Sequence, residues 1–227
     1  MSPTVTHLAL TARVAAIASS IFDPADLSAI SLDDRLRTRC AAVLVLSHAE
    51  IEEAIETACI ATVDALEDHP PVGFAFLAWG LSASQIGKPN QADHNKQKKA
   101  EGTVKYLLST YRGVVASSHG IREANLQRLL LPLGIKLAPL SLDIATLDNF
   151  GHERGDAAHL SPLKARLQDA PSVIESKARG AALAAERVID ELEALQTSLR
   201  GGLNLRPPQA TLFSRIRALL PFSIQSQ

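Results

Sequence analysis

The segment from Ser31 to Glu67 constrains the fold more than any other part of the chain. Its apolar residues recur at intervals of three, four, seven or eight, which places them on one face of a helix. They are Leu36, Cys40, Leu44, Ile51, Ile55, Ala58 and Leu66. Ser31, Asp33 and Asp34 form a plausible helix start, and the prolines of "HPPVG" interrupt the chain after the segment. We therefore expect one long helix over residues 31–67.

Most of the remaining chain also has helical spacing, and the strict alternation typical of strands is missing. The expected helices cover residues 4–22, 103–116, 121–131, a segment beginning at 141 or 142, and 172–199. Residues 74–86, with Trp79, are expected to pack in the core. The predicted fold class is all-α, a bundle with long early and late helices. Residues 1–200 form its helical domain, and residues 201–227 a flexible connector and a basic amphipathic tail.

Composition excludes several classes of protein. The 227 residues are 46% hydrophobic and carry a net charge of −1, which argues against a surface that coats nucleic acid. Aromatic residues make up only 4%, too few for an extended base-stacking platform. The longest apolar run in the middle of the chain, "AAVLVL", is far shorter than the roughly 20 residues of a membrane span. With no signal peptide at its N-terminus, the chain is predicted to be cytoplasmic.

The two cysteines, Cys40 and Cys59, fall in the same expected helix. Nineteen residues at about 1.5 Å each place them roughly 28 Å apart, too far for a disulfide. We expect two buried thiols, which fits a reducing compartment.

The stretch "GHERGDAAHLSP", residues 151–162, concentrates polar residues beside an apolar run. Arg154 lies four residues after Phe150 and seven after Leu147, so it continues the inward-facing line of its helix. A cation in that position needs a partner or a function, because a buried unpaired charge is costly. Gly155 costs about 1 kcal/mol relative to alanine inside a helix, which suggests fraying, a bend or a close approach.

Three interpretations of this stretch remain open. It is a helix C-terminus where Arg154 and His159 face the negative end of the helix dipole, or a metal site of His152, Asp156 and His159. In the third, an arginine and a histidine act together on phosphate. Residues five apart on a regular helix point about 140° apart. Arg154 and His159 therefore converge only if the helix breaks at Gly155 or if two copies of the chain meet.

Arg154, four intervening residues and His159 preceded by Ala158 resemble the R-x(4–6)-H signature of the HEPN superfamily (higher eukaryotes and prokaryotes nucleotide-binding). The order of the helices is similar too: a long early helix, "RTRCAAVLVLSHAEIEEAI", a late helix ending "LDNFGHERGDAAH", and a long final helix. The likeness covers roughly residues 12–199. It is greatest to the branch with a motif ending in "AH", found in bacterial toxin and defence systems.

The resemblance implies a homodimeric, metal-independent endoribonuclease with no cofactor. Two protomers of such an enzyme bring their motifs together, and the ribose hydroxyl of an RNA substrate attacks the adjacent phosphate. Arg154 would hold the phosphate, and His159 would act as acid or base. A cognate antitoxin or another defence component is the implied partner.

One position departs from the family pattern. The family usually has a polar residue directly after the arginine, whereas this chain has Gly155. Asp156 or Glu153 is the nearest polar residue that would replace it. The alternative is a non-catalytic module of the same fold that binds RNA or a protein, as in inactive members of the family.

Other residues are candidates for supporting roles. Glu50 either pairs with Arg154 or belongs to a solvated acidic face of its helix. Ser47 and His48 are further candidates for the site that contains Arg154. Lys96, Lys98 and Lys99 lie in a lysine-rich stretch that would attract RNA through its backbone charge, or serves only as a solubilising loop.

Overall fold

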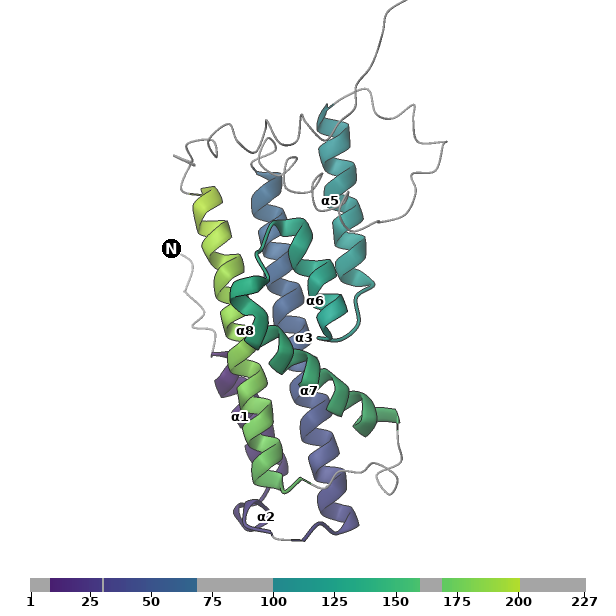
Figure 1. Ribbon diagram of the computed structural model, residues 1–227, viewed down its shortest axis with the longest axis vertical. Coiled ribbons are helices and arrows are strands. Elements are labelled where there is room, and N and C mark those ends of the chain that lie inside the picture. The colour runs from purple at the N-terminus through teal and green to yellow at the C-terminus, as the bar shows by residue number, and fades with distance from the viewer. Residues whose placement is uncertain (1–8, 30, 69–99, 160–168, 201–227) are drawn as a thin grey trace, which may run out of the picture.

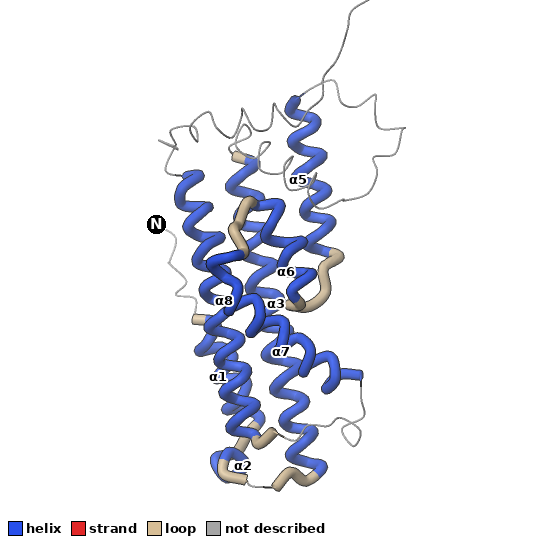
Figure 2. The backbone as a smooth tube through the Cα atoms, in the orientation of Figure 1, coloured by secondary structure: helices blue, strands red, loops and turns tan. Residues whose placement is uncertain are grey.

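The structure is a computed structural model that describes residues 9–29, 31–68, 100–159 and 169–200, with only the backbone described for residues 100–104, 156, 158 and 159. The described residues form helices joined by short loops, with no strand among them (Figure 2). The helices are α1 (Leu10–Ile21), α2 (Pro24–Leu27), α3 (Asp34–Glu67), α5 (Ala100–Ala116), α6 (Glu123–Leu130), α7 (Ser141–His159) and α8 (Pro171–Arg200). Two 3₁₀ turns, η2 (Leu131–Leu133) and η3 (Ala138–Leu140), connect α6 to α7. The predicted all-α class is confirmed.

Helices α3 and α8 form the centre of the bundle and run side by side in the same direction (Figure 1). Asp33 caps the start of α3, where its carboxylate accepts a hydrogen bond from the Leu36 backbone N–H at 2.7 Å. The face of α8 toward the core is rich in alanine, and Ala178, Ala181 and Ala185 are fully buried. Because alanine projects little beyond the backbone, α8 packs closely against the large apolar side chains of α3.

Helix α1 covers one side of the α3–α8 pair. It buries Leu10, Val14 and Ala18, which are spaced four residues apart along one face. Glu186 of α8 accepts hydrogen bonds from the backbone N–H and the hydroxyl of Thr11, at 2.8 and 3.1 Å. These contacts set the position of α1 along the bundle.

Helix α7 crosses both long helices, and α5 and α6 pack beside α3 (Figure 1). Asp143 at the start of α7 pairs with Arg187 of α8 at 2.9 Å. The hydroxyl of the buried Tyr111 on α5 donates to the Leu129 carbonyl oxygen of α6 at 2.6 Å. These contacts fix the start of α7 on α8 and hold α5 against α6.

Most of the predicted helix positions agree closely with those observed, but the first helix begins at Leu10, because Ala9, which the prediction placed inside it, lies before its start. The long helix begins at Asp34 and ends at Glu67, and the motif helix runs from Ser141 to His159. Helix α5 begins at Ala100, three residues before the predicted start, and α6 is shorter than predicted because η2 follows it. Residues 74–86 and 201–227 lie outside the described residues.

Cys40 and Cys59 are both free and buried. Burial raises the pKa of the Cys40 thiol to about 11 and that of the Cys59 thiol to about 12. Within the described residues, no helix has the length and apolar character needed to cross a membrane.

Candidate functional site

Arg154 lies at the end of the buried face of α7. Ile144, Leu147 and Phe150 of this face pack into the core, and Arg154 follows one turn later as a half-buried residue. Its Nε atom is buried and has no hydrogen-bond partner. Arg154 also forms no ion pair among the described residues. A guanidinium in this setting retains most of its capacity to bind an anion.

His48 of α3 lies within electrostatic range of Arg154. The imidazole is 2% exposed, and its Nδ1 atom is 3.5 Å from a carboxylate oxygen of Glu52 without a hydrogen bond. Burial lowers the pKa of His48; the charge of Glu52 opposes this shift, and the charge of Arg154 adds to it. Because burial dominates, the imidazole is neutral at pH 7 and does not compete with Arg154 for an anion.

The loop between α5 and α6 closes over His48. The Gly120 backbone N–H donates a hydrogen bond to Glu52, and the Asn125 amide donates to the Gly120 carbonyl oxygen at 3.2 Å. Gly120 has a φ of +90°, and a Cβ atom there would lie 3.6 Å from the imidazole of His48. The distance of 3.6 Å is an ordinary van der Waals contact, so it is the left-handed backbone that favours glycine at this position. Through Glu52, the loop is tied to the part of α3 that faces Arg154.

Glu50 does not pair with Arg154, contrary to the pairing that the sequence suggested. Its carboxylate forms an ion pair with Arg13 of α1 at 2.5 Å. Glu50 and His48 are two residues apart on α3, so they point about 160° apart around the helix. Glu50 therefore faces α1, and His48 faces α7.

The remaining predicted site residues are distributed differently. Glu153 pairs with Lys177 of α8 at 2.6 Å, which makes it a link between α7 and α8. Asp156 and His159 lie on the last turn of α7, where only the backbone is described. Lys96, Lys98 and Lys99 lie outside the described residues. The structure thus places Arg154 within electrostatic range of His48 and leaves the position of the His159 side chain untested.

Gly155 does not break the helix. Helix α7 continues through Gly155 to His159, and a Cβ atom at Gly155 would meet nothing within 4 Å. A break of the helix at Gly155 is therefore wrong, because the packing of α7 on α3 and α8 outweighs a cost of about 1 kcal/mol. Along an unbroken helix, Arg154 and His159 of one chain point about 140° apart. One chain alone does not bring them together.

No three histidine, cysteine, aspartate or glutamate side chains are placed to hold a metal ion within the part of the chain that the structure describes. His152 is exposed and lies 3.6 Å from Asp148, one turn earlier on α7. The side chains of Asp156 and His159 are not described, so the metal site that the sequence offered with His152 is not tested.

The sequence identified His48 only as a further candidate for the site and did not identify Glu52 or Gly120 as site residues. A signal was present, because His48 lies four residues after Leu44, on the apolar line of its helix. A histidine in that position is buried with the core, and its neighbours then become part of the site.

Comparison of the chain with protein-family models, with curated proteins and with solved structures gave no match.

Proposed function

We propose that this protein is a metal-independent endoribonuclease of the HEPN type, a cytoplasmic homodimer acting as a toxin or an antiviral-defence effector. The observation that supports this proposal is the environment of Arg154. Its guanidinium is half-buried, its Nε atom lacks a hydrogen-bond partner, and it forms no ion pair among the described residues. A cation held in this way is suited to bind a phosphate, which offers several acceptor oxygens to one guanidinium.

The proposed reaction is a transesterification within the RNA chain. The ribose 2′-hydroxyl loses its proton to a base and attacks the adjacent phosphorus, while the bond from phosphorus to the 5′-oxygen breaks. The leaving oxygen takes up a proton, and the products carry a 2′,3′-cyclic phosphate and a 5′-hydroxyl. Arg154 neutralises the charge that builds on the phosphate, and His159 transfers the proton.

Two copies of the chain are part of the proposal. Arg154 and His159 diverge on the unbroken α7 helix, so a site that contains both draws them from different protomers. A two-fold axis near the end of α7 would build two such sites, each with Arg154 from one copy and His159 from the other.

The second candidate function is a non-catalytic module that binds RNA or a protein. Gly155 favours it, because the family usually has a polar residue directly after the arginine, and Glu153, one of the two residues that could replace it, pairs with Lys177 of α8 instead. Arg154 would then bind a phosphate or a carboxylate without any reaction.

The experiment is cleavage of RNA by the purified full chain in the presence of EDTA. The nuclease proposal expects cleavage by the wild type, a loss of at least 100-fold in Arg154→Ala and His159→Ala, and cyclic phosphate ends on the products. Arg179→Ala, an exposed arginine of α8, is the matched control and should cut like the wild type. Activity that disappears in EDTA points to metal-dependent chemistry. RNA binding without cleavage supports the non-catalytic module.

A mixture of the two inactive variants tests the shared site. A dimer of one Arg154→Ala chain and one His159→Ala chain contains one site with both residues intact. Mixing should therefore restore part of the activity. No restoration, under conditions where subunits exchange, would contradict a site built from two copies.

A further inference from the structure

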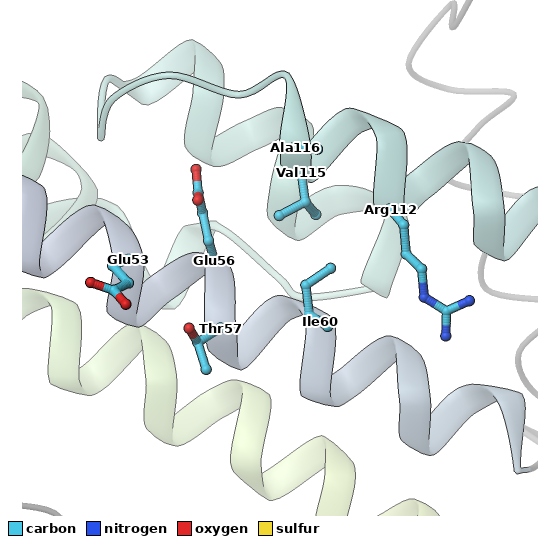
Figure 3. Close-up of a pocket in the computed structure, with 7 residues that line it drawn as sticks. All are labelled: Glu53, Glu56, Thr57, Ile60, Arg112, Val115 and Ala116. Atoms are coloured by element: carbon cyan, nitrogen blue, oxygen red, sulfur yellow. The ribbon is translucent and has the colours of Figure 1, made fainter.

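A groove runs between α3 and α5, with a volume of about 330 Å³ (Figure 3). Ile60 of α3 and Val115 and Ala116 of α5 form its apolar part. Glu53 and Glu56 line one end, and Arg112 lines the other (Figure 3). The groove is thus an apolar surface with charged ends, the form that accommodates an amphipathic segment.

The unbalanced charge of this groove is negative. Arg112 is already paired with Asp64 and Glu67 of α3, at 2.7 and 2.6 Å. Glu53 and Glu56 form no ion pair among the described residues. Burial raises the pKa of Glu56, and the charges of Glu52 and Glu53 add to this shift, whereas the charge of His119 opposes it. A cationic side chain beside these carboxylates would therefore be stabilised.

The chain itself contains a segment with the complementary properties. Residues 211–222, "TLFSRIRALLPF", lie outside the described residues. Their apolar members follow a helical spacing: Leu212, Phe213, Ile216, Leu219 and Leu220. Arg215 and Arg217 flank this apolar line, and the chain has no acidic residue after Glu193.

The connector is long enough to bring this segment to the groove. The Gln196 amide of α8 donates to the Thr62 hydroxyl of α3 at 3.0 Å, so the end of α8 lies level with the last turns of α3. From Thr62 to Glu53 is about 14 Å along the helix axis, and neighbouring helices lie about 8–10 Å apart. Ten extended residues, 201–210, span up to about 33 Å.

We propose that residues 211–222 dock in the groove between α3 and α5 of their own chain. The apolar face of the segment covers Ile60, Val115 and Ala116, and its arginines neutralise Glu53 and Glu56. This inference does not rest on the nuclease proposal, because the occupant is a segment of the chain itself and the docking needs no RNA.

A disulfide between the middle of the groove and the middle of the segment tests the proposal in the full chain. Thr57 is exposed in the groove, and Ile216 is central in the segment, so Thr57→Cys with Ile216→Cys forms a pair for either direction of docking. The control is Ser176→Cys with Ile216→Cys, because Ser176 is exposed near the opposite end of α8. Cys40 and Cys59 are buried and stay reduced.

Mild oxidation should cross-link the first pair within one chain at least about tenfold faster than the control pair, because docking raises the effective concentration of the thiols. Adding Arg215→Glu and Arg217→Glu to the first pair should remove this excess. A further change of Glu53→Arg and Glu56→Arg should restore it.

Equal rates for the two pairs in folded protein would overturn the proposal, and the segment would then be free for RNA or a membrane surface. Cross-links between chains instead of within one chain would also overturn it, in favour of a second copy. Faster cross-linking that does not respond to the charge reversals would contradict the recognition of the arginines by Glu53 and Glu56.

Discussion

The buried His48 makes the stability of this protein sensitive to acid in a way that one substitution isolates. Its imidazole is 2% exposed, and burial lowers its pKa from the ordinary value of about 6.5. The unfolded chain therefore takes up a proton at a higher pH than the folded chain does. As pH falls below about 6.5, the unfolded state gains protons first, and the free energy of unfolding decreases.

The size of this effect has an upper bound. One group that is protonated only in the unfolded state lowers the free energy of unfolding by at most about 1.4 kcal/mol per pH unit. Because the unfolded imidazole titrates near pH 6.5, midway between pH 7.5 and 5.5, His48 lowers the free energy of unfolding by up to about 1.4 kcal/mol over this range. For a chain of this size, that corresponds to a fall of roughly 3–6 °C in Tm. The charged groups that face the imidazole are Glu52, which reduces the effect, and Arg154, which increases it.

The assay is urea unfolding of the wild type and His48→Gln at pH 7.5, 6.5 and 5.5. Other groups titrate in both proteins, so the difference between their pH profiles reports His48. We expect the wild type to lose up to about 1.4 kcal/mol more than the variant between the two extremes. A His48→Gln profile parallel to that of the wild type would refute the reasoning.

Three further predictions follow from local features. Gly155→Ala should raise the free energy of unfolding by about 0.5–1 kcal/mol in urea titrations, because a helical Cβ there meets nothing within 4 Å; a loss of stability would show that α7 does not continue as a helix. Gly120→Ala should lower it by about 1–2 kcal/mol, because alanine is strained at a φ of +90°; an unchanged midpoint would contradict the observed loop. Cys40 and Cys59 should not react with a thiol reagent at pH 8 until the chain unfolds. The reason is that burial raises the pKa of the Cys40 thiol to about 11 and that of the Cys59 thiol to about 12. Labelling of the folded protein at the rate of the urea-unfolded chain would contradict their burial.

The helices of this protein could be located from the sequence because their signals are local. Asp33 caps α3 with its own carboxylate, the apolar residues repeat with the period of the helix, and proline follows where α3 ends. The inward position of Arg154 came from the same rule, since it lies four residues after the buried Phe150. Each of these inferences uses residues within one or two turns of each other.

The composition of the candidate site depended on contacts between distant parts of the chain. Helical spacing places Glu50 and His48 on different faces of α3, but only the packing of α1 and α7 decides which face meets Arg154. Glu52 holds Gly120, 68 residues later in the chain, through a loop whose path no local pattern indicates. Local patterns in the sequence were therefore enough to locate most of the helices and to identify their apolar faces. Which polar side chains meet followed from the packing of the helices, because burial against a neighbouring helix, rather than local propensity, selects their partners.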